Sequence, residues 1–262
     1  MHSLTIFQQH FAVAERLLQQ YQLAGDLVWS VPDEELLQAL PEGWGKERAD
    51  AVQMATNAHV LILFRPTARI PGSLRVAGGL DFLLRQAVVV ACTALETFLW
   101  ETLRGSALTV VRARRRGADS ELRNLTLTLE EYVGLGSSSD PDESLRQLLL
   151  ARFDRQVLHD VASIERVARM LGIRDFWRRL EQATGSSASG LRLLVGDLVA
   201  RRNLITHRAD RAGEGEAADG HGLRPIALAW TNHRLQAVNT VVTAAAGLFA
   251  AALTKLAREI RE

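Results

Sequence analysis

Apolar residues recur every three or four positions along most of the chain, which is the spacing of one face of an α-helix. The pattern predicts helices over residues 4–21, 79–104, 141–157, 160–171, 174–183, 191–207 and 229–260. Residues 46–64 are also expected to be helical, although "HVLILF" at 59–64 would by itself suit a strand. Strand patterns are otherwise few, so the sequence predicts an all-α fold built as a helical bundle.

Cap residues mark several helix boundaries. Thr128 followed by Glu131 has the pattern of a capping box. Asp140 before Pro141 is typical of a helix start, because aspartate caps the first turn and proline fits its first position. A short helix is expected over 32–40, with acidic residues in its first turn.

Two glycine-rich stretches interrupt the helical pattern. Residues 65–79, "RPTARIPGSLRVAGG", form a connector, and residues 211–222, "RAGEGEAADGHG", form a loop that we expect to be mobile. The connector divides the chain into an N-terminal helical extension of unknown role, residues 1–74, and a helical domain, residues 75–262.

One position breaks the apolar face of the helix expected over 191–207. Leu191, Val195, Leu198 and Ile205 share that face, and the position that would complete it holds Arg202. A guanidinium at a core-facing position is costly unless it is paired, hydrogen-bonded or facing a cavity. Either an acidic residue meets Arg202, or Arg202 lines a cleft that receives an anion.

Asn203 and His207 are polar residues four positions apart, so they lie on one face of the same helix. Arg202 lies roughly 140° from His207 around the helix axis. A long arginine side chain, or a second copy of the helix across a two-fold axis, would bring these groups around one groove. The plainer alternative is an arginine that reaches solvent and a histidine that caps the helix end.

The composition is that of an ordinary globular chain, with 47% hydrophobic residues and a net charge of +1. Nucleic-acid contact would therefore need a local basic patch. The single cysteine, Cys92, excludes a disulfide framework and a zinc site within one chain. We interpret it as a small buried apolar residue.

Targeting and cofactor patterns are also missing from the sequence. The first residues lack the features of a signal peptide, and the apolar run at 237–253 is short for a membrane span and contains polar residues. A cytoplasmic location is therefore expected. No GxxxxGK[ST] phosphate loop occurs, which argues against ATP or GTP hydrolysis, and neither a cofactor nor a metal is expected.

The stretch "RRNLITH" at 201–207 resembles the motif of the HEPN superfamily, in which an arginine and a polar residue precede a histidine by a few positions. Arg202, Asn203 and His207 match it position by position. "VVVACTALETFLWETL" at 88–103 is similar to the first core helix of the superfamily. "VARMLGIRDFWRRL" at 167–180 is similar to a segment of its RiboL-PSP-type branch, and the resemblance covers about residues 75–262.

This resemblance implies a HEPN-like bundle that dimerises through the surface bearing the motif. Many members are metal-independent endoribonucleases of toxin–antitoxin and anti-phage defence systems, and others are inactive modules that bind RNA or nucleotide. The implied catalytic residues are Arg202, Asn203 and His207. The implied partners are an RNA substrate, a second copy of the chain and an antitoxin or other defence protein.

The three side chains suit cleavage of RNA by its own 2′-OH. An imidazole, whose intrinsic pKa is about 6.5, serves as base or acid at neutral pH. A guanidinium binds phosphate oxygens and the charge that develops on them, and an amide orients the histidine or the substrate. The expected products carry a 2′,3′-cyclic phosphate and a 5′-OH.

Other polar residues are weaker candidates. Glu96 interrupts the apolar helix at 79–104 and either pairs with Arg202 or lies exposed between two apolar faces. Arginines near these elements would contact an RNA backbone, or else belong to solvated loops. This weaker RNA-binding set comprises Arg112, Arg114, Arg115, Arg116, Arg201 and Arg208.

Three functions remain open from the sequence. The chain is a ribonuclease toxin or defence effector, a catalytically silent HEPN module that binds RNA or nucleotide or regulates a partner, or a helical scaffold. The intact pair Arg202 and His207 favours the ribonuclease. No residue points to a particular RNA.

Overall fold

The computed structural model describes residues 2–25, 27–30, 34–39, 53–58, 61–64, 78–114, 126–153, 158 and 160–260. Within these ranges the chain is predominantly helical, which confirms the predicted all-α class. The helices are α1 (His2–Gly25), α2 (Glu34–Ala39), α3 (Asp81–Arg114), α5 (Leu129–Ser137), α6 (Pro141–Phe153), α7 (Val161–Met170), α8 (Phe176–Thr184), α9 (Ala188–Arg208) and α10 (Leu228–Glu259). The strands are β1 (Val28–Ser30), β2 (Gln53–Thr56) and β3 (Leu61–Phe64).

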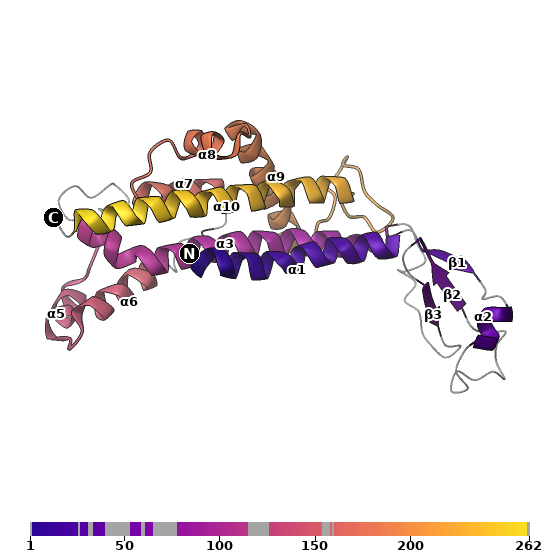
Figure 1. The fold of residues 1–262 in the computed structure, drawn as a ribbon, viewed down its shortest axis with the longest axis horizontal. Helices are drawn as coiled ribbons and strands as arrows, with labels where there is room; N and C mark the ends of the chain where they lie inside the picture. The colour runs from indigo at the N-terminus through magenta and orange to yellow at the C-terminus, as the bar shows by residue number, and fades with distance from the viewer. Residues whose placement is uncertain are drawn as a thin grey trace.

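The central element of the bundle is α3, which packs against α1, α9 and α10 (Figure 1). Aromatic rings connect these helices through the core. The ring of Phe98 on α3 lies 6.3 Å from that of Phe7 on α1 and 5.9 Å from that of Phe249 on α10. Phe249 lies a further 5.9 Å from Phe176 on α8. Such ring pairs add to the stabilisation from burial, so one continuous core joins α1, α3, α8 and α10.

The first helix belongs to this core and not to a separate unit. Phe7, Phe11, Ala14 and Leu18 recur at helical spacing and are buried with the residues of α3. The boundary predicted at residue 74 therefore does not separate α1 from the helical domain. The physical reason is that an apolar helix face must be covered, and α3 covers that of α1.

A small antiparallel sheet lies beyond one end of the bundle, whereas α5 and α6 lie near the other (Figure 1). β2 pairs with β1 and with β3, so that Gln53 faces Phe64. The helix expected over 46–64 was therefore wrong for residues 53–58 and 61–64. Asn57 favours a turn over a helix interior, and its side-chain amide donates to the carbonyl of Leu23 at 2.6 Å.

Several predicted caps are confirmed. Thr128 and Glu131 exchange the two hydrogen bonds of a capping box at the start of α5. The Asp140 carboxylate accepts from the backbone N–H of Glu143 in the first turn of α6. α3 continues beyond the predicted end at 104 because Ala107 and other residues past that point remain buried in the core.

Among the residues that the structure describes, two helices, α3 and α10, are long and apolar enough to cross a membrane by length and composition alone. Core helices of a bundle meet the same criterion. In α3, 56% of the apolar window is buried inside the protein, so packing accounts for much of its apolar surface.

Candidate active site

The last turns of α9 carry the three motif residues. The helix begins after Ser187, whose hydroxyl accepts from the backbone N–H of Gly190 at 3.3 Å. Leu191, Val195 and Leu198 are buried, and α9 packs against α3 and α10. This apolar face sets the rotation of α9 and directs the next position of the face, Arg202, towards α3.

Arg202 meets an acidic residue of α3. Its side chain is only 12% exposed, and its Nη2 lies 3.5 Å from Oε2 of Glu96. Its Nη1 donates to Oδ1 of Asn203 at 3.1 Å. The two polar interruptions seen in the sequence, one in each helix, are therefore partners across the α3–α9 contact.

Cys92 lies beside this pair, one turn before Glu96. The thiol is fully buried, and burial raises the pKa of the Cys92 thiol to about 12. The charge of Arg202 and a hydrogen bond from it lower that pKa, but by less than burial raises it. The side chain is thus the small buried residue that the sequence indicated.

Asn203 and His207 lie towards the outer side of α9. Asn203 is half-buried and contacts Arg202 through the hydrogen bond above. His207 is exposed in the last turn, and no described side chain forms a hydrogen bond or ion pair with its ring. The structure therefore brings Glu96, Arg202 and Asn203 together and leaves His207 one turn further along the helix.

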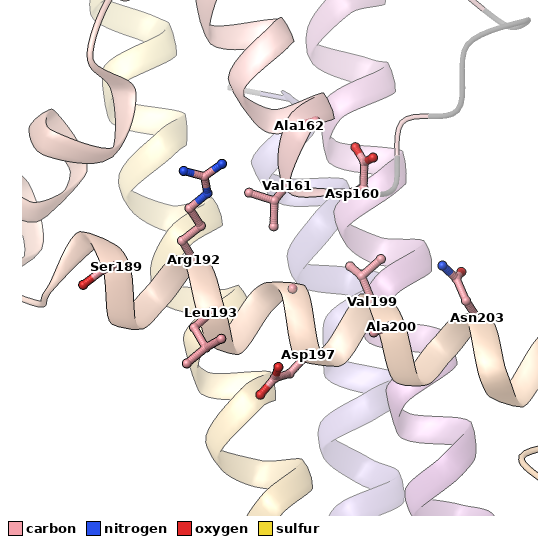
Figure 2. A pocket seen from close by; sticks show the side chains of 11 residues that line it. Asp160, Val161, Ala162, Ser189, Arg192, Leu193, Asp197, Val199, Ala200 and Asn203 are labelled. Atoms are coloured by element: carbon pink, nitrogen blue, oxygen red, sulfur yellow. The ribbon is translucent and has the colours of Figure 1, made fainter. Parts of the chain in front are cut away.

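A shallow groove of about 700 Å³ follows the outer face of α9 and ends at Asn203. Figure 2 shows Val199 and Asn203 projecting from α9 on the side of Asp160, the cap of α7. Gly196 and Ala200 form part of its lining between these ends. The position that a side chain would take at Gly196 lies 3.9 Å from Val161, so the groove runs between α9 and the start of α7.

The charged residues of the groove already have partners. Arg192 lies 3.2 Å from Glu165, and Asp197 lies 2.7 Å from Arg234 on α10. Arg234 also stacks over the ring of Trp230 at 4.2 Å. The groove consequently presents apolar and small surface more than free charge.

Arg201 differs from its predicted role as a weak RNA contact. Its side chain is 14% exposed, and its Nη2 lies 2.8 Å from Oδ2 of Asp210, which is completely buried. The same Nη2 donates to the carbonyls of Arg224 and Pro225 at 2.8 and 3.1 Å. These groups occupy Nη2 of Arg201 inside the fold, which favours a structural role, and contact of this residue with RNA stays a prediction.

Asp210 is the residue that sequence reasoning missed. Its Oδ2 accepts from Nε of Arg85 on α3 at 2.8 Å as well as from Arg201. Asp210 and its neighbour Ala209 both have positive φ, 56° and 49°, a region that non-glycine residues rarely adopt. The available signal was an aspartate directly after the motif helix, since aspartate tolerates this conformation better than most residues.

The loop at 211–222 is fastened at several points, although its mobility stays a prediction. The Asp219 carboxylate accepts from the backbone N–H groups of His221 and Leu223 at 2.8 and 2.9 Å, and Nη2 of Arg85 lies 3.2 Å away. These hydrogen bonds, that of Leu223 first, hold the pKa of Asp219 below its usual range. Arg224 pairs with Glu216 at 2.6 Å across the loop.

Of the remaining arginines in the weak RNA-binding set, the structure describes the side chains of Arg208 and Arg112. Arg208 is exposed in the last turn of α9. Arg112 forms an ion pair with Asp142 at the start of α6, far from α9 along α3. Arg115 and Arg116, together with the side chain of Arg114, lie outside the described residues.

Comparisons with protein-family models, with curated proteins and with solved structures found no match. Among the described residues, no group of three or more histidine, cysteine, aspartate or glutamate side chains is placed to hold a metal ion.

Proposed function

We propose that this chain is a metal-independent endoribonuclease of the HEPN type that acts as a toxin or anti-phage effector. The observation that carries the proposal is the arrangement of Arg202. A guanidinium sits in an otherwise apolar face, is oriented by Glu96 and Asn203, and lies on the same helix as an exposed histidine. An oriented cation and an accessible base are two of the groups that phosphodiester cleavage needs.

The mechanism assigns one role to each residue. The exposed imidazole of His207 takes the proton of the RNA 2′-OH or protonates the leaving 5′ oxygen. As the 2′ oxygen attacks phosphorus and the bond to the 5′ oxygen breaks, negative charge grows on the phosphate oxygens. Arg202 stabilises that charge through its planar donors, and Asn203 orients Arg202. The products carry a 2′,3′-cyclic phosphate and a 5′-OH.

A second copy of the chain would complete this site. One imidazole cannot hold both the base and the acid roles at once, and two motif helices related by a two-fold axis would supply two. The outer face of α9 supports such a contact because Ala200 is small and exposed and Leu193 is 65% exposed. A homodimer of this kind predicts that Leu193→Glu shifts the sedimentation of the protein at micromolar concentration towards that of a monomer.

The low exposure of Arg202 favours a second candidate function. Because only 12% of its side chain is accessible and Glu96 already lies beside it, Arg202 also fits a structural ion pair in a catalytically silent module. Such a module would bind RNA or nucleotide, or would regulate a partner protein through the apolar groove that ends at Asn203. The two functions differ in whether His207 is needed for chemistry.

The test is RNA cleavage by the full-length protein in EDTA. We expect single-stranded or loop RNA to be cut to ends with a 2′,3′-cyclic phosphate, because the 2′-OH is the nucleophile and the proposed chemistry uses no metal. His207→Ala is expected to abolish cutting, whereas the matched control His233→Ala, an exposed histidine of α10, is expected to leave it unchanged. Equal cutting by both variants, or no cutting by the wild type, would favour the silent module.

Arg202 provides a second arm of the same test. Arg202→Ala is expected to lower kcat by about a hundredfold or more, the usual effect of removing a donor that stabilises an oxyanion. Arg202→Lys is expected to restore little of this loss because an ammonium cannot make two parallel contacts to phosphate. A full rescue by lysine would argue for a simple charge effect at the α3–α9 contact.

A further inference from the structure

Asp210 forms the centre of a buried cluster that joins three segments of the chain. Its carboxylate is completely buried and lies 2.8 Å from one nitrogen each of Arg85 and Arg201. Arg85 comes from α3 and Arg201 from α9, while Asp210 begins the connection to α10. Arg85 also reaches Asp219 and the carbonyl of Arg224 further along this connection. We call these residues, Arg85, Arg201 and Asp210, the Asp210 lock.

The backbone at the lock fixes where α9 ends. The N–H of Asp210 donates to the carbonyl of Leu204 at 3.0 Å, and the N–H of Ala209 donates to the same carbonyl. Ala209 and Asp210 both occupy the left-handed region. Two such residues in succession persist only where the surroundings hold them. The lock therefore determines the shape of the turn that immediately follows His207.

The lock is not arranged to give the greatest stability. Oδ1 of Asp210 and Nε of Arg201 are buried without a hydrogen-bond partner in the described protein. Buried ion pairs are weak sources of stability in general, because desolvation opposes their attraction. Incompletely satisfied buried polar atoms and a strained turn point together to a role in geometry.

We propose that Asp210 is a positioning residue for His207: its buried carboxylate, held by Arg85 and Arg201, fixes the last turn of α9 and with it the place of the histidine. The inference rests on the proposed ribonuclease function. His207 lies three residues before Asp210, inside the turn that the carboxylate fastens to α3. The side chain of Asp210 is fully enclosed, so it acts on the reaction only through the position of the helix end.

Asp210→Asn is the direct test. Asparagine adopts positive φ as readily as aspartate, so this variant removes the charge without adding backbone strain. We expect kcat for RNA to fall by about a hundredfold, the scale of a displacement of about 1 Å in a reacting group, with KM unchanged because RNA does not touch Asp210. Backbone amides of residues 204–211 are expected to lose protection against hydrogen exchange.

The matched control is Glu216→Gln, which removes a carboxylate of the same connection that pairs with the side chain of Arg224, whereas the lock binds only the backbone carbonyl of Arg224. It is expected to leave kcat and the exchange of residues 204–211 unchanged. Arg85→Met should reproduce the effects of Asp210→Asn, and the double variant should be no worse than either single variant, because both break the same contact. If Asp210→Asn does not fold, Arg85→Lys, which keeps one donor for the carboxylate, carries the same two readouts.

The outcomes separate this inference from the proposed function. If the wild-type protein leaves RNA intact, the proposed ribonuclease function is wrong, and Asp210 then has no catalytic role. Hydrogen exchange then still decides whether the lock fixes the turn at His207. Exchange at residues 204–211 and kcat that are the same in Asp210→Asn and Glu216→Gln would overturn the positioning role even if the wild type cuts RNA. A rise in KM at constant kcat would do so as well.

Discussion

Arg201 and Arg202 are neighbours on one helix, yet they occupy different electrostatic environments. Arg201 lies 2.8 Å from a carboxylate that is completely buried, whereas Arg202 lies 3.5 Å from one that is 42% exposed. The first pair is sealed and shared with Arg85. The second is longer, and its carboxylate faces water although the side chain of Arg202 itself is only 12% exposed. An arginine whose partner already faces water would give up less on binding a phosphate, which is why we propose a catalytic role for Arg202 and a structural one for Arg201.

The reactivity of the Cys92 thiol measures how accessible the surroundings of Arg202 are to solvent. An accessible thiol beside a guanidinium would be reactive, because a cation favours the thiolate. Since burial instead raises the pKa of the Cys92 thiol to about 12, the thiolate fraction at pH 8 is expected to be about a thousandfold lower than in an ordinary thiol. Maleimide or disulfide reagents should label the folded protein at least that much more slowly than the unfolded chain. Fast labelling of the native protein would place an open cleft at Arg202.

Replacement of Arg201 should have the next largest effect. Arg201→Met keeps much of the aliphatic volume but leaves the buried carboxylate of Asp210 with Arg85 alone. Breaking a buried ion pair from one side typically costs several kcal/mol, so we expect the free energy of unfolding to fall by roughly 3 kcal/mol. Chemical denaturation monitored by helical circular dichroism measures it. A loss below about 1 kcal/mol would mean that Arg85 holds the carboxylate without help.

The matched variant Arg202→Met should change stability far less. Its partner Glu96 is 42% exposed and can be solvated when the guanidinium is removed, and exposed ion pairs contribute about 1 kcal/mol or less. A methionine also suits the apolar face that Leu198 and Ile205 form on either side. We expect a change within about 1 kcal/mol in the same denaturation experiment. A destabilisation as large as that of Arg201→Met would make Arg202 a structural residue and weaken the ribonuclease proposal.

The sequence pointed to the surroundings of Arg202 but not to the buried carboxylate that binds Arg201. A guanidinium in the apolar face of residues 191–207 and Glu96 in the apolar face of residues 79–104 were visible as breaks in two periodic patterns. Periodicity locates such residues because a core face admits few exceptions. Their contact also needs the rotation and relative height of two helices, which is why the sequence left it as one of two alternatives.

The Asp210 lock could not be found in this way. Arg85 and Asp210 are 125 positions apart, and Asp210 belongs to no periodic face, so nothing local links them. The strands were missed for a related reason. Residues 53–56 pair with β1 on one side and with residues 61–64 on the other, and pairing partners are not encoded in the pattern of a single short segment. Helices, by contrast, form their backbone hydrogen bonds within one segment, so apolar periodicity and cap residues predicted most of their boundaries.

The smallest effect is expected when acid protonates Asp219, the carboxylate that shares Arg85 with Asp210. The backbone N–H groups of Leu223 and His221, together with Arg85, hold the pKa of Asp219 below its usual range. A carboxyl whose pKa is lower in the folded state contributes stability above its unfolded pKa and loses it as the pH falls through the folded value. We therefore expect the contacts of Asp219 to persist through neutral and mildly acidic pH and to weaken below about pH 4, the ordinary range of aspartate. Amide NMR shifts of Leu223 and His221 followed from pH 6 downwards measure this. In Asp219→Asn the shifts of the same amides should not change as the pH falls. A change that survives in this variant would assign the acid sensitivity to another carboxylate. Glu216, whose pKa is also lowered, would then be the next residue to replace.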